Sequence, residues 1–260
     1  MSSTLASAAI FPKDSTVKML DPKGFRKAMK ANQTCMVAFV APWCGHCQRM
    51  VPEYSKAASG LHPLIPTYAV DCDADANKPL CAEQGVKGFP TLFPRGKELN
   101  PMTYESGERT AGAFFKWASN RVPNHVKKLG RLDNIHTWVE DSAKRGLPRA
   151  LLLTKDTKNP LLWKVLGNKY TGQIELASHI DVKGASSEAL GYEAGSEKSS
   201  KVLVYAPGST SPVRYQGVTK LDAISKFFDS VIDGTAELQP DNVTSEPAEP
   251  EPASAPKDEL

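Results

Sequence analysis

Two cysteines, Cys44 and Cys47, are separated by two residues within the stretch 37–52, which reads V-A-F-V-A-P-W-C-G-H-C-Q-R-M-V-P. The apolar run that opens this stretch predicts a buried strand, and the residues after the second cysteine follow a helical pattern. The pair therefore lies where a strand turns into a helix, and a helix N-terminus presents unpaired N–H groups and a partial positive charge. These groups favour a thiolate on Cys44, and the thiolate is the reactive form. The spacing predicts redox chemistry on sulfur.

A fixed structural disulfide and half of a zinc site are the alternatives for this pair. A zinc knuckle needs a second Cys/His pair at ligand spacing. The remaining cysteines and histidines do not supply such a pair, because Cys72 and Cys81 form no C-x-x-C and the five histidines are scattered. We therefore expect no metal site.

The string A-P-W-C-G-H-C at residues 41–47 resembles the active-site signature of the protein disulfide isomerases, a branch of the thioredoxin fold. The resemblance is to the small fungal members with one active domain. It implies that Cys44 attacks client disulfides and that Cys47 resolves stalled mixed disulfides. It also implies that His46 stabilises the Cys44 thiolate and that Trp43 shields one side of the site. No cofactor is implied, because the electrons stay on sulfur.

A mixed α/β domain over residues 15–122 is expected to position these groups. Asp21 and Pro22 read as the start of its first helix. Pro52 lies within the helix that follows the cysteines and should kink it. The expected strands are 15–20, one that Cys35 opens, 67–71, 91–94 and 102–105, and the expected helices are 22–32, one following the cysteines, 77–84 and about 110–121.

A second diagnostic segment is V-K-G-F-P-T at residues 86–91. The resemblance places a cis-proline beside the cysteine pair, and Pro90 matches that position. Phe89 before it would present its backbone to an extended substrate, as in strand addition. A plain trans turn is the alternative.

Two further assignments, Arg109 and the Cys72–Cys81 pair, are supported by the resemblance, and a third, Cys35, comes from the residue type alone. Arg109 matches an arginine that can swing toward the second cysteine and stabilise its thiolate, and an ordinary surface arginine is the alternative. Cys72 and Cys81 match positions that carry a structural disulfide in several members, and two buried thiols are the alternative. Cys35 reads as a small buried hydrophobe, with a reactive third thiol as the minority interpretation.

The sequence departs from the family pattern at two positions. Many members have a buried glutamate six residues before the first cysteine, where this chain has Ala38. They also have a lysine two residues before the strand-ending aspartate, where this chain has Ala69. Joint loss of a buried ion pair is physically coherent, because either charge alone would be costly to bury. We therefore expect slow proton transfer at Cys47.

The second half of the chain, residues 123–235, contains no cysteine and repeats the order of strands and helices expected in the first. We interpret it as a redox-inactive thioredoxin-like domain, with an unrelated α/β domain as the alternative. Its expected strands are 147–154, 173–179, 201–206 and 211–215, and its expected helices are 132–139, 161–170 and 219–232.

The two ends of the chain differ in composition from the middle. Residues 1–14 read as a flexible N-terminus without the basic and apolar regions of a signal peptide. Residues 236–260 hold seven acids and one lysine, and they read as a disordered tail. That tail ends in Lys257-Asp258-Glu259-Leu260, a retrieval signal of the endoplasmic reticulum. We therefore expect that the natural signal peptide is missing from this chain. Asn32 and Asn242 open glycosylation sequons, and an unused sequon is the alternative.

The net charge of +3 is uneven, with −6 in residues 236–260 and +9 in residues 1–235, and the basic residues form no dense patch, so nucleic-acid binding is not expected. No apolar run is long enough for membrane insertion. The sequence predicts a protein disulfide isomerase of the endoplasmic reticulum lumen. Its partners would be misoxidised client polypeptides, an oxidase or glutathione, and the KDEL receptor. A client-binding chaperone module and a cytosolic reductase remain the alternatives.

Overall fold

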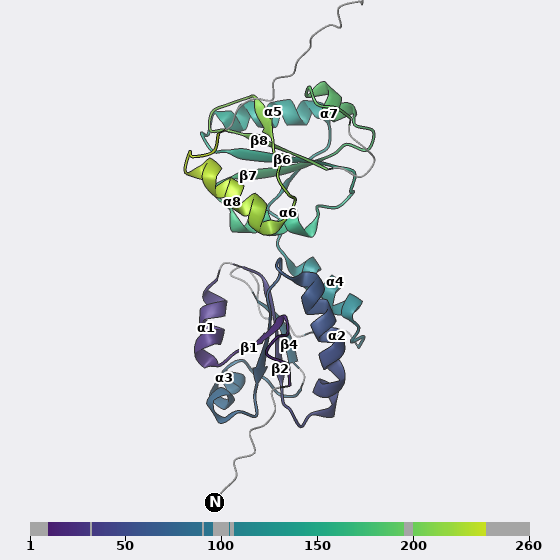
Figure 1. Ribbon diagram of the computed structural model, residues 1–260, viewed down its shortest axis with the longest axis vertical. Coiled ribbons are helices and arrows are strands. Elements are labelled where there is room, and N and C mark those ends of the chain that lie inside the picture. Colours follow the sequence, from purple (N-terminus) through teal and green to yellow (C-terminus); the bar gives the residue numbers. More distant parts are fainter. Residues whose placement is uncertain are drawn as a thin grey trace, which may run out of the picture.

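The computed structural model describes residues 10–31, 33–89, 91–95, 104, 107–194 and 200–237. Two α/β units follow each other along the chain, each built around its own sheet (Figure 1). Within these residues, no helix combines the length and the apolar character that crossing a bilayer requires.

The first unit has a four-stranded sheet in the order β1-β3-β2-β4. β2 runs parallel to β3 and antiparallel to β4, and all six of its residues are buried. A strand that is covered on both faces needs apolar residues at every position, which explains the continuous apolar run in the sequence. The strands are β1 (Val17–Met19), β2 (Cys35–Val40), β3 (Thr67–Asp71) and β4 (Thr91–Arg95).

Helices cover both faces of this sheet, α1 and α3 on one side and α2 and α4 on the other (Figure 1). Alternate residues of β2 enter the two cores: Ala38 packs with Tyr54 and Phe114, and Val37 packs with Phe25 and Leu80. The helices are α1 (Pro22–Lys30), α2 (Gly45–Leu61), α3 (Lys78–Glu83) and α4 (Ala111–Arg121), and a 3₁₀ turn, η1 (Asp75–Asn77), precedes α3.

The second unit repeats the connectivity seen among the described strands of the first, and its described residues form five strands in the order β5-β7-β6-β8-β9. β6 is central, parallel to β7 and antiparallel to β8, as β2 is to β3 and β4. The predicted repeat of strand order is therefore confirmed. The elements are β5 (Lys127–Leu129), α5 (Leu132–Ala143), β6 (Arg149–Thr154), α6 (Leu161–Lys169), β7 (Glu175–Ile180), α7 (Ala185–Ala189), β8 (Lys201–Tyr205), β9 (Pro212–Arg214) and α8 (Leu221–Ile232).

Several predicted boundaries need adjustment. The first helix ends at Lys30 instead of 32, and the predicted helix at 77–84 is a 3₁₀ turn followed by α3. β5 and α7 were not predicted, because three and five residues are too few to show a period. The predicted strand 102–105 lies outside the described residues apart from Tyr104.

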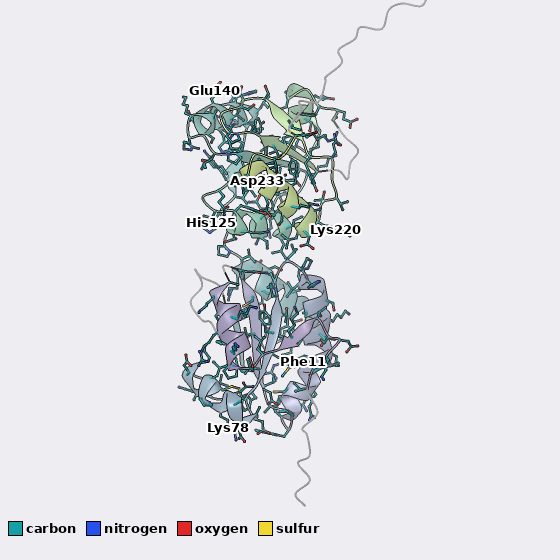
Figure 2. All side chains as sticks on the ribbon, turned by 60° about the vertical axis from the view of Figure 1, so that its left-hand side comes forward. Phe11, Lys78, His125, Glu140, Lys220 and Asp233 are labelled. Atoms are coloured by element: carbon teal, nitrogen blue, oxygen red, sulfur yellow. A yellow bond between two sulfur atoms is a disulfide. The ribbon has the colours of Figure 1, made fainter. Side chains whose placement is uncertain are left out.

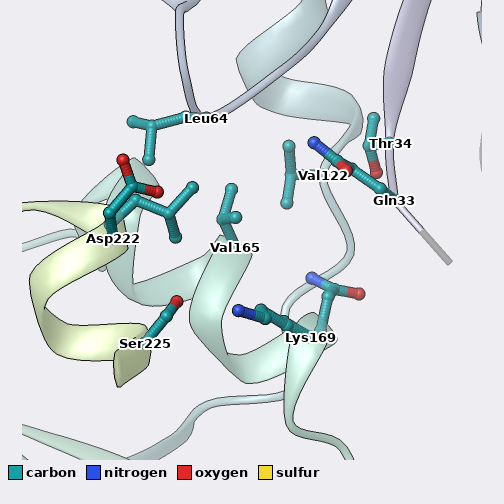
Figure 3. Close-up of a pocket in the computed structure, with 10 residues that line it drawn as sticks. Gln33, Thr34, Leu64, Val122, Val165, Lys169, Asp222 and Ser225 are labelled. Atoms are coloured by element: carbon teal, nitrogen blue, oxygen red, sulfur yellow. The ribbon is translucent and has the colours of Figure 1, made fainter. Parts of the chain in front are cut away.

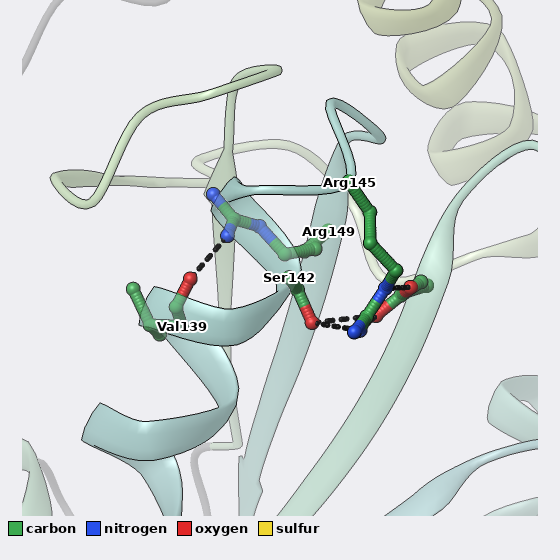
Figure 4. A network of polar contacts seen from close by, with 5 residues as sticks. Val139, Ser142, Arg145 and Arg149 are labelled. Atoms are coloured by element: carbon green, nitrogen blue, oxygen red, sulfur yellow. Dashed lines mark hydrogen bonds and ion pairs between the residues drawn. The ribbon is translucent and has the colours of Figure 1, made fainter.

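A buried arginine, Arg149, is the first residue of β6 and lies within the segment 147–154 that the sequence predicts to be a buried strand. Arg149 is 0% exposed and donates to the carbonyl oxygens of Val139, Ala206 and Ser209. Burial lowers the pKa of this guanidinium. Nearby, Arg145 forms a two-pronged ion pair with Glu175, with both N···O distances 2.8 Å (Figure 4). The carbonyl bonds let a charged residue occupy a core strand.

The two units meet through α6 and the end of α4. Lys164 Nζ donates to the Ser119 carbonyl at 2.9 Å, and Asn168 Nδ2 donates to the Pro123 carbonyl at 2.7 Å. Val165 packs against the core that α2 and α4 share with the sheet. In Figure 2, His125 and Lys220 lie near this junction, and Lys78 lies at the opposite end of the first unit.

Candidate active site

The predicted cysteine pair lies at the start of α2. Cys44 is the N-cap residue, and its carbonyl accepts from Gln48 N at 3.0 Å, which closes the first helical turn. A turn joins it to the end of β2, with Cys44 N donating to the Ala41 carbonyl at 3.1 Å. Cys44 is 8% exposed, and Cys47, one turn into the helix, is 0% exposed. Both are thiols, and Cys44 is the one that reaches the surface.

The two thiols have pKa values shifted in opposite directions. Burial acts to raise the pKa of Cys44, but hydrogen bonds from the Cys47 side chain and from the backbone of Cys47 and His46, with the charge of Arg109, lower it overall. Burial raises the pKa of Cys47 to about 12, helped by the neighbouring Cys44 sulfur and opposed by a hydrogen bond with the Ala41 backbone. The helix N-terminus thus stabilises the thiolate of Cys44, whereas burial in the core keeps Cys47 in its protonated form.

This difference predicts selective alkylation. The rate of reaction with iodoacetamide follows the thiolate fraction, and a lowered pKa gives Cys44 a larger thiolate fraction at neutral pH. We expect Cys44 to react at a lower pH than the same residue in the denatured chain, and Cys47 to stay unlabelled until strongly alkaline pH. Peptide mapping by mass spectrometry against pH checks this. Faster labelling of Cys47 than of Cys44 would contradict the assignment.

One wall of the site comes from the segment before β4. Cys44 Sγ lies 3.7 Å from the carbonyl oxygen of Phe89, so the structure brings this predicted residue against the first cysteine of the pair. The Trp43 ring meets the Phe89 ring edge-on, with centroids 6.0 Å apart. Trp43 is 66% exposed, so a large apolar surface lies beside the sulfur. Pro90, with its predicted cis bond, lies outside the described residues.

Asp73 positions the Trp43 indole, and no motif or periodicity in the sequence marks it. Trp43 Nε1 donates to Asp73 Oδ1 at 3.0 Å across 30 residues of sequence. The Asp73 N–H donates to Asp71 Oδ1 at 2.9 Å, which fixes the loop after β3. A loop aspartate is too common to single out without knowing that β2 and β3 are neighbours.

His46 and Arg109 are both exposed. His46 Nδ1 lies 2.9 Å from Arg49 Nη2, a residue that the sequence analysis missed. The backbone of His46 contributes to the lowered pKa of Cys44. The charge of Arg109 acts to lower the pKa of both active-site thiols. Its predicted swing toward Cys47 stays a prediction.

The remaining cysteines occupy the opposite face of the sheet. Cys72 and Cys81 form a disulfide with a Cα–Cα distance of 5.9 Å, which ties the end of β3 to α3. Cys35 is 3% exposed and belongs to the same core cluster, whereas Cys47 belongs to the cluster across the sheet. Cys35 is therefore separated from the active-site pair by β2. The sequons at Asn32 and Asn242 begin outside the described residues.

Ala38 and Ala69 are Cα partners in the β2–β3 pairing. Both are 0% exposed, and both lie in the core cluster that contains Cys47. The two departures from the family pattern are thus a single feature, a small apolar pair where a buried ion pair was expected. Among the described residues, no group of His, Cys, Asp and Glu side chains could hold a metal ion.

Restoring a proton acceptor at this pair is expected to speed turnover. A buried glutamate has a raised pKa, which suits it to take the proton of Cys47. We expect Ala38→Glu to raise the rate of thiol–disulfide exchange by about 100-fold, the lower end of the range of general-base effects. Stopped-flow oxidation of the reduced protein measures this. Ala38→Gln is the matched control, because it adds the same bulk without the base, and equal rates for both variants would contradict the prediction.

A buried, low-pKa cysteine at the N-cap of the helix after a central strand, with a protonated partner one turn later, defines a dithiol site of the thioredoxin class. Residues 16–120 match the family model described as Thioredoxin. The chain is 38% identical over 157 residues to a mitochondrial thioredoxin domain-containing protein of Schizosaccharomyces pombe, covering 58% of this chain and 42% of that protein. It is 31% identical over 185 residues to protein disulfide-isomerase MPD1 of Saccharomyces cerevisiae, covering 65% and 57%. Residues 16–120 thus match a thioredoxin domain, and the relatives that the chain resembles include proteins named protein disulfide-isomerase.

The chain spans about half the length of these curated relatives. Among solved structures, the first two thioredoxin domains of Naumovozyma dairenensis Eps1p align with 85% of this chain and 98% of that chain, at 19% identity and a TM-score of 0.39. ERdj5 form I aligns with 86% of this chain and 30% of that chain, at 21% identity and a TM-score of 0.48.

Proposed function

We propose that this protein is a protein disulfide isomerase that forms, reduces and rearranges disulfides in client polypeptides. The observation that carries the proposal is the asymmetry of the pair. Cys44 is exposed enough to be attacked or to attack, with a lowered pKa, whereas Cys47 is enclosed and its pKa is about 12. One thiol is suited to meet clients, and the other is suited to act only on the first.

The proposed reduction begins when the Cys44 thiolate attacks a client disulfide. A bond forms between Cys44 and one client sulfur, and the other client sulfur leaves as a thiolate that takes a proton. Cys47 then loses its proton and attacks Cys44, which releases the second client thiol and leaves the Cys44–Cys47 disulfide. The client disulfide gains two electrons, and the protein dithiol loses them. Oxidation runs the same steps backward, and isomerisation occurs when a client thiol displaces Cys44 instead.

The walls of the site support binding of an extended client segment. The carbonyl of Phe89 beside Cys44 Sγ is an acceptor for a client N–H, as in strand addition. Trp43 offers an exposed apolar ring next to it. Pro90, which lacks an N–H, would complete this edge. We assign these three residues to client binding.

We propose a division into a redox-active domain at 15–122 and a redox-inactive thioredoxin-like domain at 123–235. The sequence contains no cysteine in the second of these segments, and its sheet has the connectivity of the first. A client disulfide can therefore be exchanged only in the first domain. The 236–260 segment would act as an acidic tail.

We place this activity in the lumen of the endoplasmic reticulum. The tetrapeptide 257–260 is a retrieval signal when it ends a chain, and it would engage the KDEL receptor. An oxidase of that compartment or glutathione would recharge the pair. Immunolocalisation of the endogenous protein tests this, and a mitochondrial location, as the name of the S. pombe relative states for that protein, would overturn it.

The reduction potential of the Cys44–Cys47 pair tests the proposed function. We expect equilibrium with a glutathione buffer to give about −180 mV, as for isomerases of this family, and not the value of about −270 mV of thioredoxin. Recovery of activity from scrambled ribonuclease should accompany it. A thioredoxin-like potential without ribonuclease recovery would indicate a reductase.

A client-binding chaperone is the second candidate. The exposed Trp43 ring favours it, because an exposed apolar side chain can hold unfolded segments without any thiol step. Suppression of client aggregation by the Cys44→Ser/Cys47→Ser double variant would show this activity separately from exchange.

A further inference from the structure

A hydrogen bond joins the helix that carries the cysteines to the start of α4. The Ala111 N–H donates to Glu53 Oε2 at 2.6 Å, across 58 residues of sequence. Glu53 lies on α2 and is half-buried, and Ala111 is the first residue of α4. The N–H groups of a first helical turn have no partner within their own helix, and they carry a partial positive charge. A carboxylate that accepts from one of them therefore stabilises the helix and fixes its start.

α4 does not supply this anion from its own sequence. Its first turn contains no acidic residue. Its N-cap, Thr110, accepts from Ala113 N at 3.2 Å through a neutral hydroxyl. The hydroxyl of the N-cap and the carboxylate of Glu53 therefore satisfy two different N–H groups, and the charge at the start of α4 comes from the helix that carries the cysteines.

α2 and α4 pack with their chains running in the same direction. Beyond the hydrogen bond at Glu53, a Cβ at Gly60 would lie 3.5 Å from the Phe115 ring, so later residues of α2 meet later residues of α4. Past the ends of the two helices, Leu64 and Val122 both line a cavity between the two units (Figure 3). The hydrogen bonds from α6 described above also hold this end of α4. The second unit therefore fixes the end of α4, and Glu53 fixes its start.

Arg109 lies two residues before Ala111, so its backbone moves with the start of α4. Against the burial that raises them, its charge acts to lower the pKa values of Cys44 and Cys47. Glu53 follows Cys47 on α2 by less than two turns, which is about 9 Å along the helix axis. Two residues of extended chain cover about 7 Å, so the chain can return from the point that Glu53 anchors toward the pair. The distance between the guanidinium and the thiols therefore depends on where α4 begins.

We propose that Glu53 is a positioning residue for thiol–disulfide exchange, which anchors the start of α4 to α2 and thereby keeps Arg109 close to Cys44 and Cys47. This inference rests on the proposed exchange function. An effect of position and a direct effect of charge have opposite signs. As a negative charge alone, Glu53 would disfavour both thiolates, so its removal would speed their reactions. As the anchor of Arg109 it supports both thiolates, so its removal slows them.

The test labels the reduced full-length chain with iodoacetamide over a series of pH values and follows Cys44 by peptide mapping. We expect Glu53→Ala to react about three-fold more slowly at pH values where this thiol is only partly ionised, the effect of weakening one partly exposed charge interaction. Glu53→Gln keeps an oxygen acceptor for the Ala111 N–H, so it should react at least as fast as the parent. In an Arg109→Ala background, Glu53→Ala should slow the reaction no further, because the charge that it positions is gone.

A variant that weakens α4 elsewhere controls for lost stability. Lys116→Gly lowers helix propensity at an exposed position of α4 away from its start. It should lower the melting temperature without slowing the labelling of Cys44. Labelling of Glu53→Ala that is as fast as in the parent, or equal slowing with and without Arg109, would overturn the proposal. Because labelling needs no client, that result would leave the proposed isomerase activity standing, whereas failure of the parent to recover scrambled ribonuclease would remove that activity without changing the labelling rates.

Discussion

Replacing Cys44 by serine is expected to abolish thiol–disulfide exchange, with a loss on the order of 10³-fold or more, as for loss of a nucleophile. Cys44 is 8% exposed whereas Cys47 is 0% exposed, and hydrogen bonds at the N-terminus of α2 lower the pKa of Cys44. A serine hydroxyl cannot form or accept the mixed disulfide. Insulin reduction and recovery of scrambled ribonuclease measure the loss.

The matched control for this variant is Cys35→Ala. Cys35 is also a buried thiol of the first unit, but it lies in the core cluster on the other face of β2. Its loss should leave both assays within about two-fold of the parent, because Cys35 lies in a different core cluster from the active-site pair. Retained exchange in Cys44→Ser, or its loss in Cys35→Ala, would show that the nucleophile has been misassigned.

Replacing Cys47 by serine is expected to trap clients on the protein. Cys47 is 0% exposed and its pKa is about 12, so it meets no client directly and serves to attack Cys44 from within. Without it, a mixed disulfide at Cys44 lasts until an external thiol attacks it, and uncatalysed disulfide rearrangement takes minutes to hours. Non-reducing electrophoresis after mixing with an oxidised, unfolded client should show a high-mass adduct that is faint for the parent protein.

The double variant Cys44→Ser/Cys47→Ser is the control for adduct formation. It should form no adduct, because neither sulfur of the pair remains. If Cys47→Ser releases clients as fast as the parent, then client thiols themselves resolve the intermediate, and Cys47 has no role in escape.

The local signals in the sequence predicted the centre of the site well. An all-apolar run followed by the cysteine string predicted β2 and α2, and the structure has them at 35–40 and 45–61. Asp21 caps α1 as predicted, with Gly24 N donating to its Oδ1 at 2.6 Å. These features depend on residues near one another in the sequence, where hydrophobic period and capping chemistry act directly.

Contacts between distant residues could not be predicted in this way. Asp73 and Trp43 meet because β2 and β3 are adjacent, and no period or motif encodes that meeting. The same holds for Ala38 and Ala69. The resemblance identified each as a separate departure from the family pattern, and only the strand register shows that they are direct partners. Arg149 is a further case, since a charged residue in an apolar run is tolerated only because three distant carbonyls accept from it.

The Cys72–Cys81 disulfide has a consequence for how the protein is handled. Asp73, which holds the Trp43 indole, directly follows Cys72, and α3, which carries Cys81, leads to Phe89. The Trp43 side and the Phe89 side of the site beside Cys44 are therefore both connected to the Cys72–Cys81 disulfide. A strong laboratory reductant such as dithiothreitol that opened it would loosen the walls while it also supplied electrons to the catalytic pair. Turnover driven by dithiothreitol and turnover driven by glutathione would then report on two differently shaped enzymes.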